Sequence, residues 1–99
     1  MRRAARVDSN HVEIRNAFRK FGCWVADIHD IGKGLPDLLI AVPPAWSLAL
    51  IEIKDGSKPP SQRKLTEQES KLHETCPAMI WIVTSLDDVQ TVVHFYRAG

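Results

Sequence analysis

Three ionisable residues interrupt the most apolar segment of the chain. Asp37 precedes an apolar run at residues 38–42, and Glu52 and Lys54 lie at the end of a second run that starts at residue 48. Both runs have the length and composition of buried strands. A buried charge without a partner costs much free energy, so charges at these positions need a partner or a chemical role.

A tight turn between the two runs would bring the three side chains together. If the turn is centred between Pro44 and Ala45, residues whose numbers add to 89 face each other, and Asp37 faces Glu52. Opposed side chains have Cβ atoms about 4.5–5.5 Å apart. Lys54 shares the face of Glu52 because strand side chains alternate. Two carboxylates that close repel unless a cation or proton lies between them, so the hairpin predicts a divalent-metal site beside a lysine.

A purely structural interpretation stays open beside this one. Asp37 can be a turn acid at the start of a strand, and Glu52 with Lys54 can form a surface ion pair on an edge strand. Three aligned charges in an apolar hairpin favour the metal site. A register shifted by one residue would place the two acids on opposite faces and would exclude that site.

The flanking segments predict the elements that hold the hairpin. Apolar residues at helical spacing from Ile14 to Phe21 predict an opening helix that ends at Gly22, and residues 23–28 predict a first strand. Thr66 with Glu69 fits a capping box, which predicts a helix from about residue 67 to 75. A strand at residues 79–83 and a last helix, capped by Ser85, complete the order α-β-β-β-α-β-α.

This order predicts an α/β fold with a mixed central sheet of about four strands. The strand that follows the second helix should lie parallel to a strand of the hairpin. Both faces of the hairpin are largely apolar, so we expect helices to cover both. The inward side of the second helix would consist of Leu65, Gln68, Leu72 and Cys76, with Gln68 as its polar member.

Composition predicts one domain over residues 1–99. Residues 1–7 carry Arg2, Arg3 and Arg6 and predict a flexible basic arm, which suits either an anionic partner or plain solvation. The cysteines, Cys23 and Cys76, lack metal-ligand spacing and are typical of a cytoplasmic protein, and no run is long enough to span a membrane. The histidines share no spacing that predicts zinc, although His29 lies near the site in sequence.

The motifs of this chain resemble those of the PD-(D/E)XK nucleases, which have a restriction-endonuclease-like core. Pro36-Asp37 matches the first half of the signature, and Glu52-Ile53-Lys54 matches the second. Nearly the whole chain is similar to the VRR-NUC family, and in particular to its small stand-alone phage-type members. The matching segments are the first helix with Glu13, residues 34–37, residues 51–54, Leu65-Thr66 with Gln68, and residues 82–87. Thr84 departs from the pattern, which has an arginine at that point.

The resemblance implies an enzyme that cleaves DNA phosphodiester bonds with Mg²⁺ or Mn²⁺ and acts as a homodimer. It implies Asp37, Glu52 and the Ile53 carbonyl as metal ligands, and Lys54 as the group that orients water or neutralises charge on the phosphate. Two residues from the helices would assist: Glu13 at the metal or its waters, and Gln68 at a water or at Lys54. Glu13 can equally be a capping-box residue after Asn10, and Gln68 can be a core amide. Plausible DNA contacts, each also explicable as a solvated residue, are Lys33, Lys58, Arg63 and Lys64.

The leading prediction is therefore a metal-dependent DNA endonuclease that nicks DNA or prefers branched or flapped DNA. A catalytically inactive DNA-binding or assembly module is the first alternative, and a Holliday-junction resolvase is the second. The combination of Asp37, Glu52 and Lys54 favours an enzyme, because a binding module does not need all three.

Overall fold

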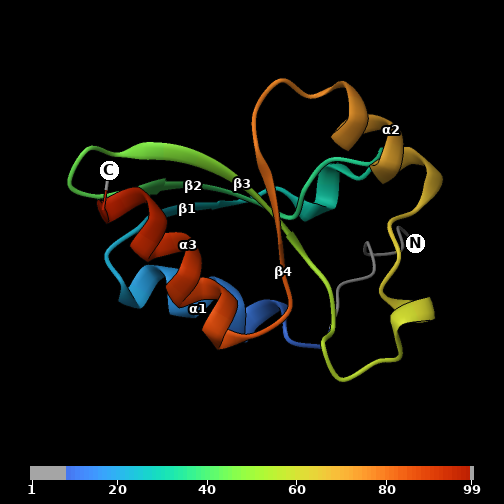
Figure 1. Ribbon diagram of the computed structural model, residues 1–99, viewed down its shortest axis with the longest axis horizontal. Coiled ribbons are helices and arrows are strands. Elements are labelled where there is room, and N and C mark those ends of the chain that lie inside the picture. The colour runs from blue at the N-terminus through green and yellow to red at the C-terminus, as the bar shows by residue number, and fades with distance from the viewer. Residues whose placement is uncertain (1–8, 99) are drawn as a thin grey trace.

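The computed structural model describes residues 9–98, so the predicted basic arm at residues 1–7 lies outside the described part of the chain. The element order confirms the prediction and adds two short 3-10 helices, η1 and η2 (Figure 1). The elements are α1 (His11–Lys20), β1 (Trp24–Asp27), η1 (His29–Ile31), β2 (Leu38–Val42), β3 (Ser47–Ile53), η2 (Pro60–Gln62), α2 (Glu67–Thr75), β4 (Ile80–Val83) and α3 (Leu86–Ala98).

The four strands form one mixed sheet in the order β1-β2-β3-β4. β1 and β3 both run antiparallel to β2, whereas β4 runs parallel to β3, as predicted for a strand reached through a helical crossover. In the hairpin, Leu38 pairs with Ile51 and Val42 pairs with Ser47. This is the predicted register, and it sets which side chains share a face.

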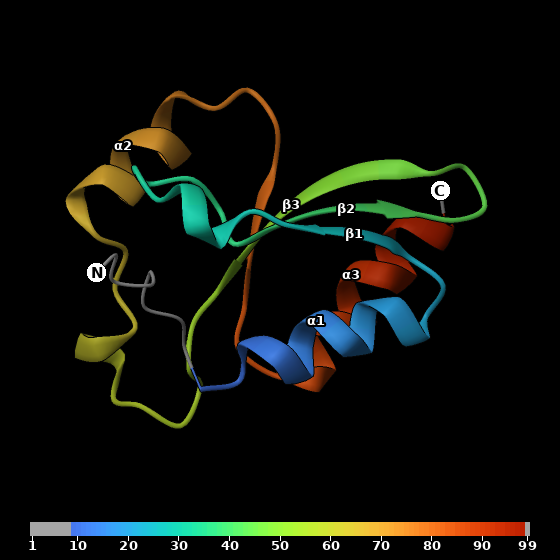
Figure 2. The same ribbon diagram turned by 180° about the vertical axis from the view of Figure 1, so that it is seen from behind.

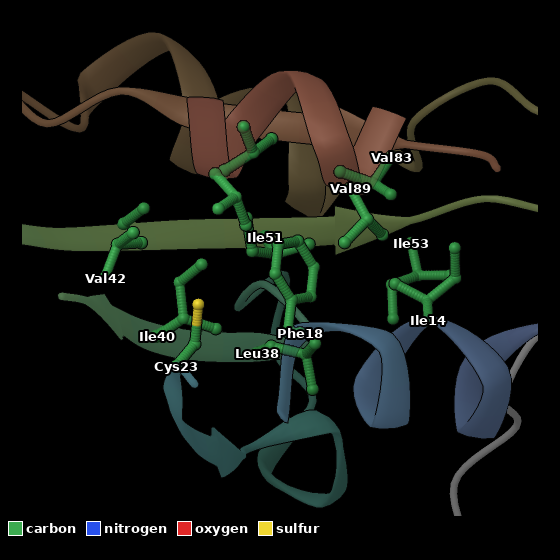
Figure 3. Close-up of a cluster of buried hydrophobic side chains, with 13 residues drawn as sticks. Ile14, Phe18, Cys23, Leu38, Ile40, Val42, Ile51, Ile53, Val83 and Val89 are labelled. Atoms are coloured by element: carbon green, nitrogen blue, oxygen red, sulfur yellow. The ribbon is translucent and has the colours of Figure 1, made fainter. Parts of the chain in front are cut away.

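The core lies between one face of the sheet and the helices α1 and α3. Leu38 and Ile40 from β2 point to the same side as Ile51 from β3, and all three are fully buried (Figure 3). Ile14 and Phe18 reach this layer from α1 and are also fully buried. Each such side chain contributes about 1.5–3 kcal/mol when it leaves water. The helical spacing of the apolar residues in α1 thus places them against one face of the hairpin, where they hold it in position.

Among residues 9–98, the opposite face of the sheet is covered where Glu52 lies but exposed over most of its area, so the prediction of helices over both faces holds only in part. α2 contains no buried residue, and both views place it beyond the end of the sheet, beside η1 (Figures 1 and 2). The exposed fractions are 54% for Trp24, 67% for Leu48 and 48% for Ile82. The physical reason is composition, because α2 offers one apolar side chain, Leu72, and cannot cover a sheet. Gln68, expected on its inward side, is exposed.

A glycine brings α2 close to the loop that precedes the hairpin. Gly34 has φ +82°, and a Cβ placed on it would lie 2.6 Å from the backbone oxygen of Gln68. Any larger residue would therefore push α2 away from the loop. Gly32, two residues earlier, has φ +68°, but a Cβ there would meet no described atom within 4 Å.

These two glycines give a matched test of the contact between α2 and the loop. Gly32→Ala should cost about 1–3 kcal/mol of unfolding free energy, because φ 68° and ψ −143° are strained for any residue with a Cβ. Gly34→Ala should cost about 1–3 kcal/mol more, because overpacking against α2 is added to the strain of a positive φ. Urea denaturation of both variants measures the difference. Equal losses would contradict the close approach of Gly34 to α2.

Candidate active site

The structure brings the three ionisable residues of the hairpin together. The Ile53 N–H donates to Asp37 Oδ2 at 2.7 Å, which ties the start of β2 to the end of β3. Lys54 Nζ lies 3.7 Å from Glu52 Oε2. Asp37 and Glu52 follow the side-chain alternation of Leu39 and Leu50, so they lie on the sheet face that α1 and α3 leave open.

Glu52 is the most constrained member of this group. Its exposed fraction is 2%, and its Oε1 atom has no hydrogen-bond partner among the described residues. Burial, followed by the charges of Asp37 and Glu69, raises the pKa of Glu52 to about 9. At neutral pH the carboxyl therefore holds a proton unless a cation takes its place. A buried acid oxygen without a partner, beside a second carboxylate, fits a divalent cation.

Glu69 belongs to this group, and sequence reasoning missed it. Lys54 Nζ donates to Glu69 Oε1 at 2.9 Å, and the same oxygen accepts the Thr66 N–H at 2.8 Å. Burial alone would raise the pKa of Glu69, but the bonds from Thr66, Lys54 and Glu52 lower it. The sequence identified Glu69 as a capping-box residue, which the structure confirms, and gave no signal for its contact with Lys54.

The two predicted assisting residues lie elsewhere. Gln68 is exposed and lines a surface groove with Lys33 and Lys71. Glu13 is exposed on α1 and lines a different groove, near Asp55. Since α1 packs on the opposite face of the sheet from Glu52, the expected contact of Glu13 with a metal gains no support. The alternative, a capping box, is also unsupported, because the Asn10 side chain makes no cap hydrogen bond.

Asn10 instead joins the ends of two strands. Its Nδ2 donates to the backbone oxygens of Lys54 and Thr84, each at 3.1 Å. Ser9 Oγ donates to Asp55 Oδ2 at 2.7 Å. The residues before α1 thus hold the chain immediately after Glu52 and Lys54.

The predicted DNA contacts lie in two segments, the loop before Asp37 and the connection that follows Lys54. Lys33 is exposed, in the loop that leads to Asp37, and its φ is 58°. Lys58, Arg63 and Lys64 lie in the connection between β3 and α2. Arg63 is half-buried and its Nε has no hydrogen-bond partner in the described part of the chain, whereas Lys64 is exposed.

A second polar cluster, not predicted from the sequence, joins α1, β1 and η1. His11 Nε2 lies 2.8 Å from Asp27 Oδ2, and His29 Nδ1 contacts the other oxygen of Asp27. Arg15 Nη1 donates to Asp27 Oδ2 at 3.3 Å. Burial alone would raise the pKa of Asp27, but the hydrogen bonds from His29 and His11 hold it well below its usual range. The hydrogen bond to Asp27 raises the pKa of His29.

The ligand atoms of His11, Asp27 and His29 all lie within 4.8 Å of one another, which is close enough to hold a metal ion. Two observations favour a hydrogen-bonded junction instead. Arg15 is a fixed positive charge on Asp27, and both Asp27 oxygens already accept hydrogen bonds. We therefore interpret the cluster as the link between α1 and the edge of the sheet. His11 lies 16 residues before Asp27 and on a different element, and the members follow no metal-binding spacing, so the sequence did not predict the cluster.

No protein-family model and no curated protein matches this chain. A solved structure described as a VRR_NUC domain does match, with a TM-score of 0.60 and 22% sequence identity. The match covers 90% of this chain and 99% of that one. The chain has the VRR_NUC fold. This agrees with the resemblance found at Pro36-Asp37 and Glu52-Ile53-Lys54. Among residues 9–98 of this chain, none of the helices has both the length and the apolar composition needed to span a membrane.

The pKa of Glu52 predicts how stability depends on pH. Because the folded-state pKa is about 9 and the ordinary value is 4.5, the unfolded chain binds fewer protons between these two values. The free energy of unfolding should therefore fall as pH rises through this window, by up to about 1.4 kcal/mol per pH unit. Glu52→Gln should remove most of this decline, and the raised pKa of His29 should leave a smaller one above pH 6.5. Urea denaturation in the presence of a chelator, from pH 5 to 9, measures it.

Glu74→Gln provides the control, because Glu74 is an exposed glutamate on α2. This variant should keep the pH dependence of the wild type. Adding Mg²⁺ or Mn²⁺ to the wild type should reduce the decline, since a cation replaces the proton. A wild type whose stability is flat over this window would contradict the assignment of a buried, protonated Glu52.

Proposed function

We propose that this protein is a DNA endonuclease that depends on Mg²⁺ or Mn²⁺ and nicks DNA or cuts branched or flapped DNA. The observation that carries the proposal is the buried Glu52 carboxyl with an unpartnered oxygen, placed beside Asp37 and Lys54. The VRR_NUC fold supports a nuclease domain, and the sequence signature of the PD-(D/E)XK nucleases falls on Asp37, Glu52 and Lys54.

In this proposal Asp37 and Glu52 hold the metal ion, with the Ile53 carbonyl as a third ligand by resemblance. When bound, Mg²⁺ or Mn²⁺ supplies Lewis-acid activation of the phosphate and of the attacking water. Oxygen ligands are those that Mg²⁺ prefers, and one or two carboxylates with substrate phosphate are sufficient. The hydrogen bond from the Ile53 N–H fixes the orientation of Asp37. The hairpin register thus presets the distance between the two acids.

Lys54 provides the positive charge of the site. Its ammonium lies between the carboxyl groups of Glu52 and Glu69, 3.7 Å from the first and 2.9 Å from the second. The side chain is 11% exposed, so its field acts in a largely water-free environment. A cation held in this way stabilises negative charge that develops on the phosphate, or orients the attacking water.

We propose that the groove beside the site receives the DNA backbone. Lys33, Gln68 and Lys71 line it, and Lys33 lies in the loop that leads to Asp37. Lysines and amides of this kind are typical phosphate contacts, which position DNA without reading its sequence. Gln68 thereby becomes a candidate for DNA binding in addition to its expected role at Lys54. Lys58, Arg63 and Lys64 extend the basic surface along the connection to α2.

Cleavage of supercoiled plasmid with Mn²⁺ or Mg²⁺ tests the proposal. Lys54→Ala should lower the rate by at least about 10²-fold, because charge stabilisation of this kind is worth roughly 3–4 kcal/mol. Asp37→Asn should also lower the cleavage rate, and it should raise the metal concentration needed for half-maximal cleavage. Lys20→Ala removes an exposed lysine from α1 and should cleave as the wild type does.

Two alternatives make different predictions in the same experiment. An inactive DNA-binding module would bind the plasmid but leave it uncut, whatever the residue at position 54. A Holliday-junction resolvase would share the dependence on Lys54 but would prefer four-way junctions to nicked or flapped duplexes. Equal cleavage by wild type and Lys54→Ala would exclude the site described here.

We further propose that the protein acts as a homodimer through its uncovered sheet face. Trp24 and Leu48 lie on the same face, each across from Ala41 on β2, and Ile82 continues the face on β4. Exposed apolar side chains that share one face of a sheet mark an interaction site. A second copy is the partner that we infer, because the resemblance to the small stand-alone VRR-NUC members implies a homodimer.

Light scattering at micromolar concentration tests the dimer. The wild type should have twice the mass of one chain, and Leu48→Glu should shift it to the monomer because a charge would be buried at the interface. Val12→Glu is the matched control, since Val12 is an exposed apolar residue on α1, away from this face. A monomeric wild type, or dissociation by both variants alike, would argue against this interface.

A further inference from the structure

The contact between Lys54 and Glu69 links the hairpin to the first turn of α2. The two atoms are 2.9 Å apart, and the side chains are only 11% and 15% exposed. A charge-assisted hydrogen bond that is shielded from water is stronger and more strongly oriented than a surface ion pair. This contact therefore decides where the Lys54 ammonium lies.

Glu69 is itself held in place by the helix that it caps. Its Oε1 accepts the Thr66 N–H at 2.8 Å, while its own N–H donates to Thr66 Oγ1 at 3.1 Å. This reciprocal pair is a complete capping box. The carboxylate oxygen that holds Lys54 is therefore fixed by the backbone of α2 rather than by a freely rotating side chain.

The position of α2 is fixed in turn by the loop before the hairpin. Gly34 lies so close to the Gln68 backbone that no Cβ would fit. α2 contains no fully buried residue. Two of its close contacts are those with Gly34 and Lys54, and both neighbours flank the two acids of the site.

We propose that Glu69 is a positioning residue of the hydrolytic site, which holds the Lys54 ammonium beside Glu52 through the capped start of α2. The inference rests on the proposed nuclease function. Lysine has a long, flexible side chain, and an ammonium that is free to rotate spends little time in a productive position. Glu69 removes that freedom. Its Oε1 already accepts two donors, which distinguishes its role from that of the metal ligands Asp37 and Glu52.

Three variants separate positioning from helix capping. Glu69→Ala removes the acceptor of Lys54 and should lower kcat by about 10–100-fold, as for other residues that orient a catalytic group, with KM for DNA unchanged. Glu69→Gln keeps an acceptor oxygen and should restore part of that loss. Thr66→Ala keeps the backbone N–H but removes the hydroxyl half of the cap, so it should lower the melting temperature and leave kcat within about twofold.

The measurement is single-turnover cleavage with Mn²⁺, together with NMR detection of the Lys54 ammonium protons in the metal-free protein. In the wild type these protons should exchange slowly with water, and in Glu69→Ala their signal should be lost. Equal loss of kcat in Glu69→Ala and Thr66→Ala would reduce Glu69 to a helix cap and overturn the inference. Wild-type kcat in Glu69→Ala would also overturn it. A wild type that cleaves no DNA would overturn the proposed function instead, so the two failures are distinguishable.

Discussion

The burial of the Glu52 carboxyl is the constraint on which the rest of the site depends. A carboxyl that is 2% exposed and has one oxygen without a described hydrogen-bond partner is costly in either charge state. When the carboxyl is neutral, one of its oxygens is buried without a hydrogen bond. When it is an anion, its charge needs a nearby cation. Asp37 makes the anion harder to form, whereas Lys54 makes it easier. Such a group fits the proposed metal site, in which a divalent cation would take the place of the proton.

The architecture divides the two tasks of stability and chemistry between the faces of one sheet. α1 and α3 cover one face and supply the core, which fixes the hairpin register through Leu38 and Ile51. The other face carries Asp37 and Glu52 at one end and is otherwise open. α2 adds nothing to the core, and its first turn instead supplies the acceptor for Lys54. The site is thus held by the core on one side and by the capped start of α2 on the other.

Local patterns in the sequence were sufficient to predict the hairpin. They were insufficient to predict where the elements around it lie. The register followed from strand alternation and one turn, so the meeting of Asp37, Glu52 and Lys54 was predictable, as was the capping box of Thr66 and Glu69. The place of α2 depends on the long connection after β3 and on the approach of Gly34, and neither has a periodic signal. For that reason Glu69, and not the neighbouring Gln68, turned out to hold Lys54. The junction of His11, Asp27 and His29 was missed for the same reason, since three separate elements build it.

The fold places the uncovered sheet face directly beside the site. Leu48, Leu50 and Glu52 alternate onto the same face of β3, so the apolar surface leads directly to the buried carboxyl. A second copy that covers Leu48 would therefore lie next to the acids of the first, and by symmetry the two sites would lie near one interface. Such an arrangement offers two hydrolytic centres to one DNA molecule. Dimerisation on this face would then do more than bury apolar surface, because it would set the spacing between the two cuts.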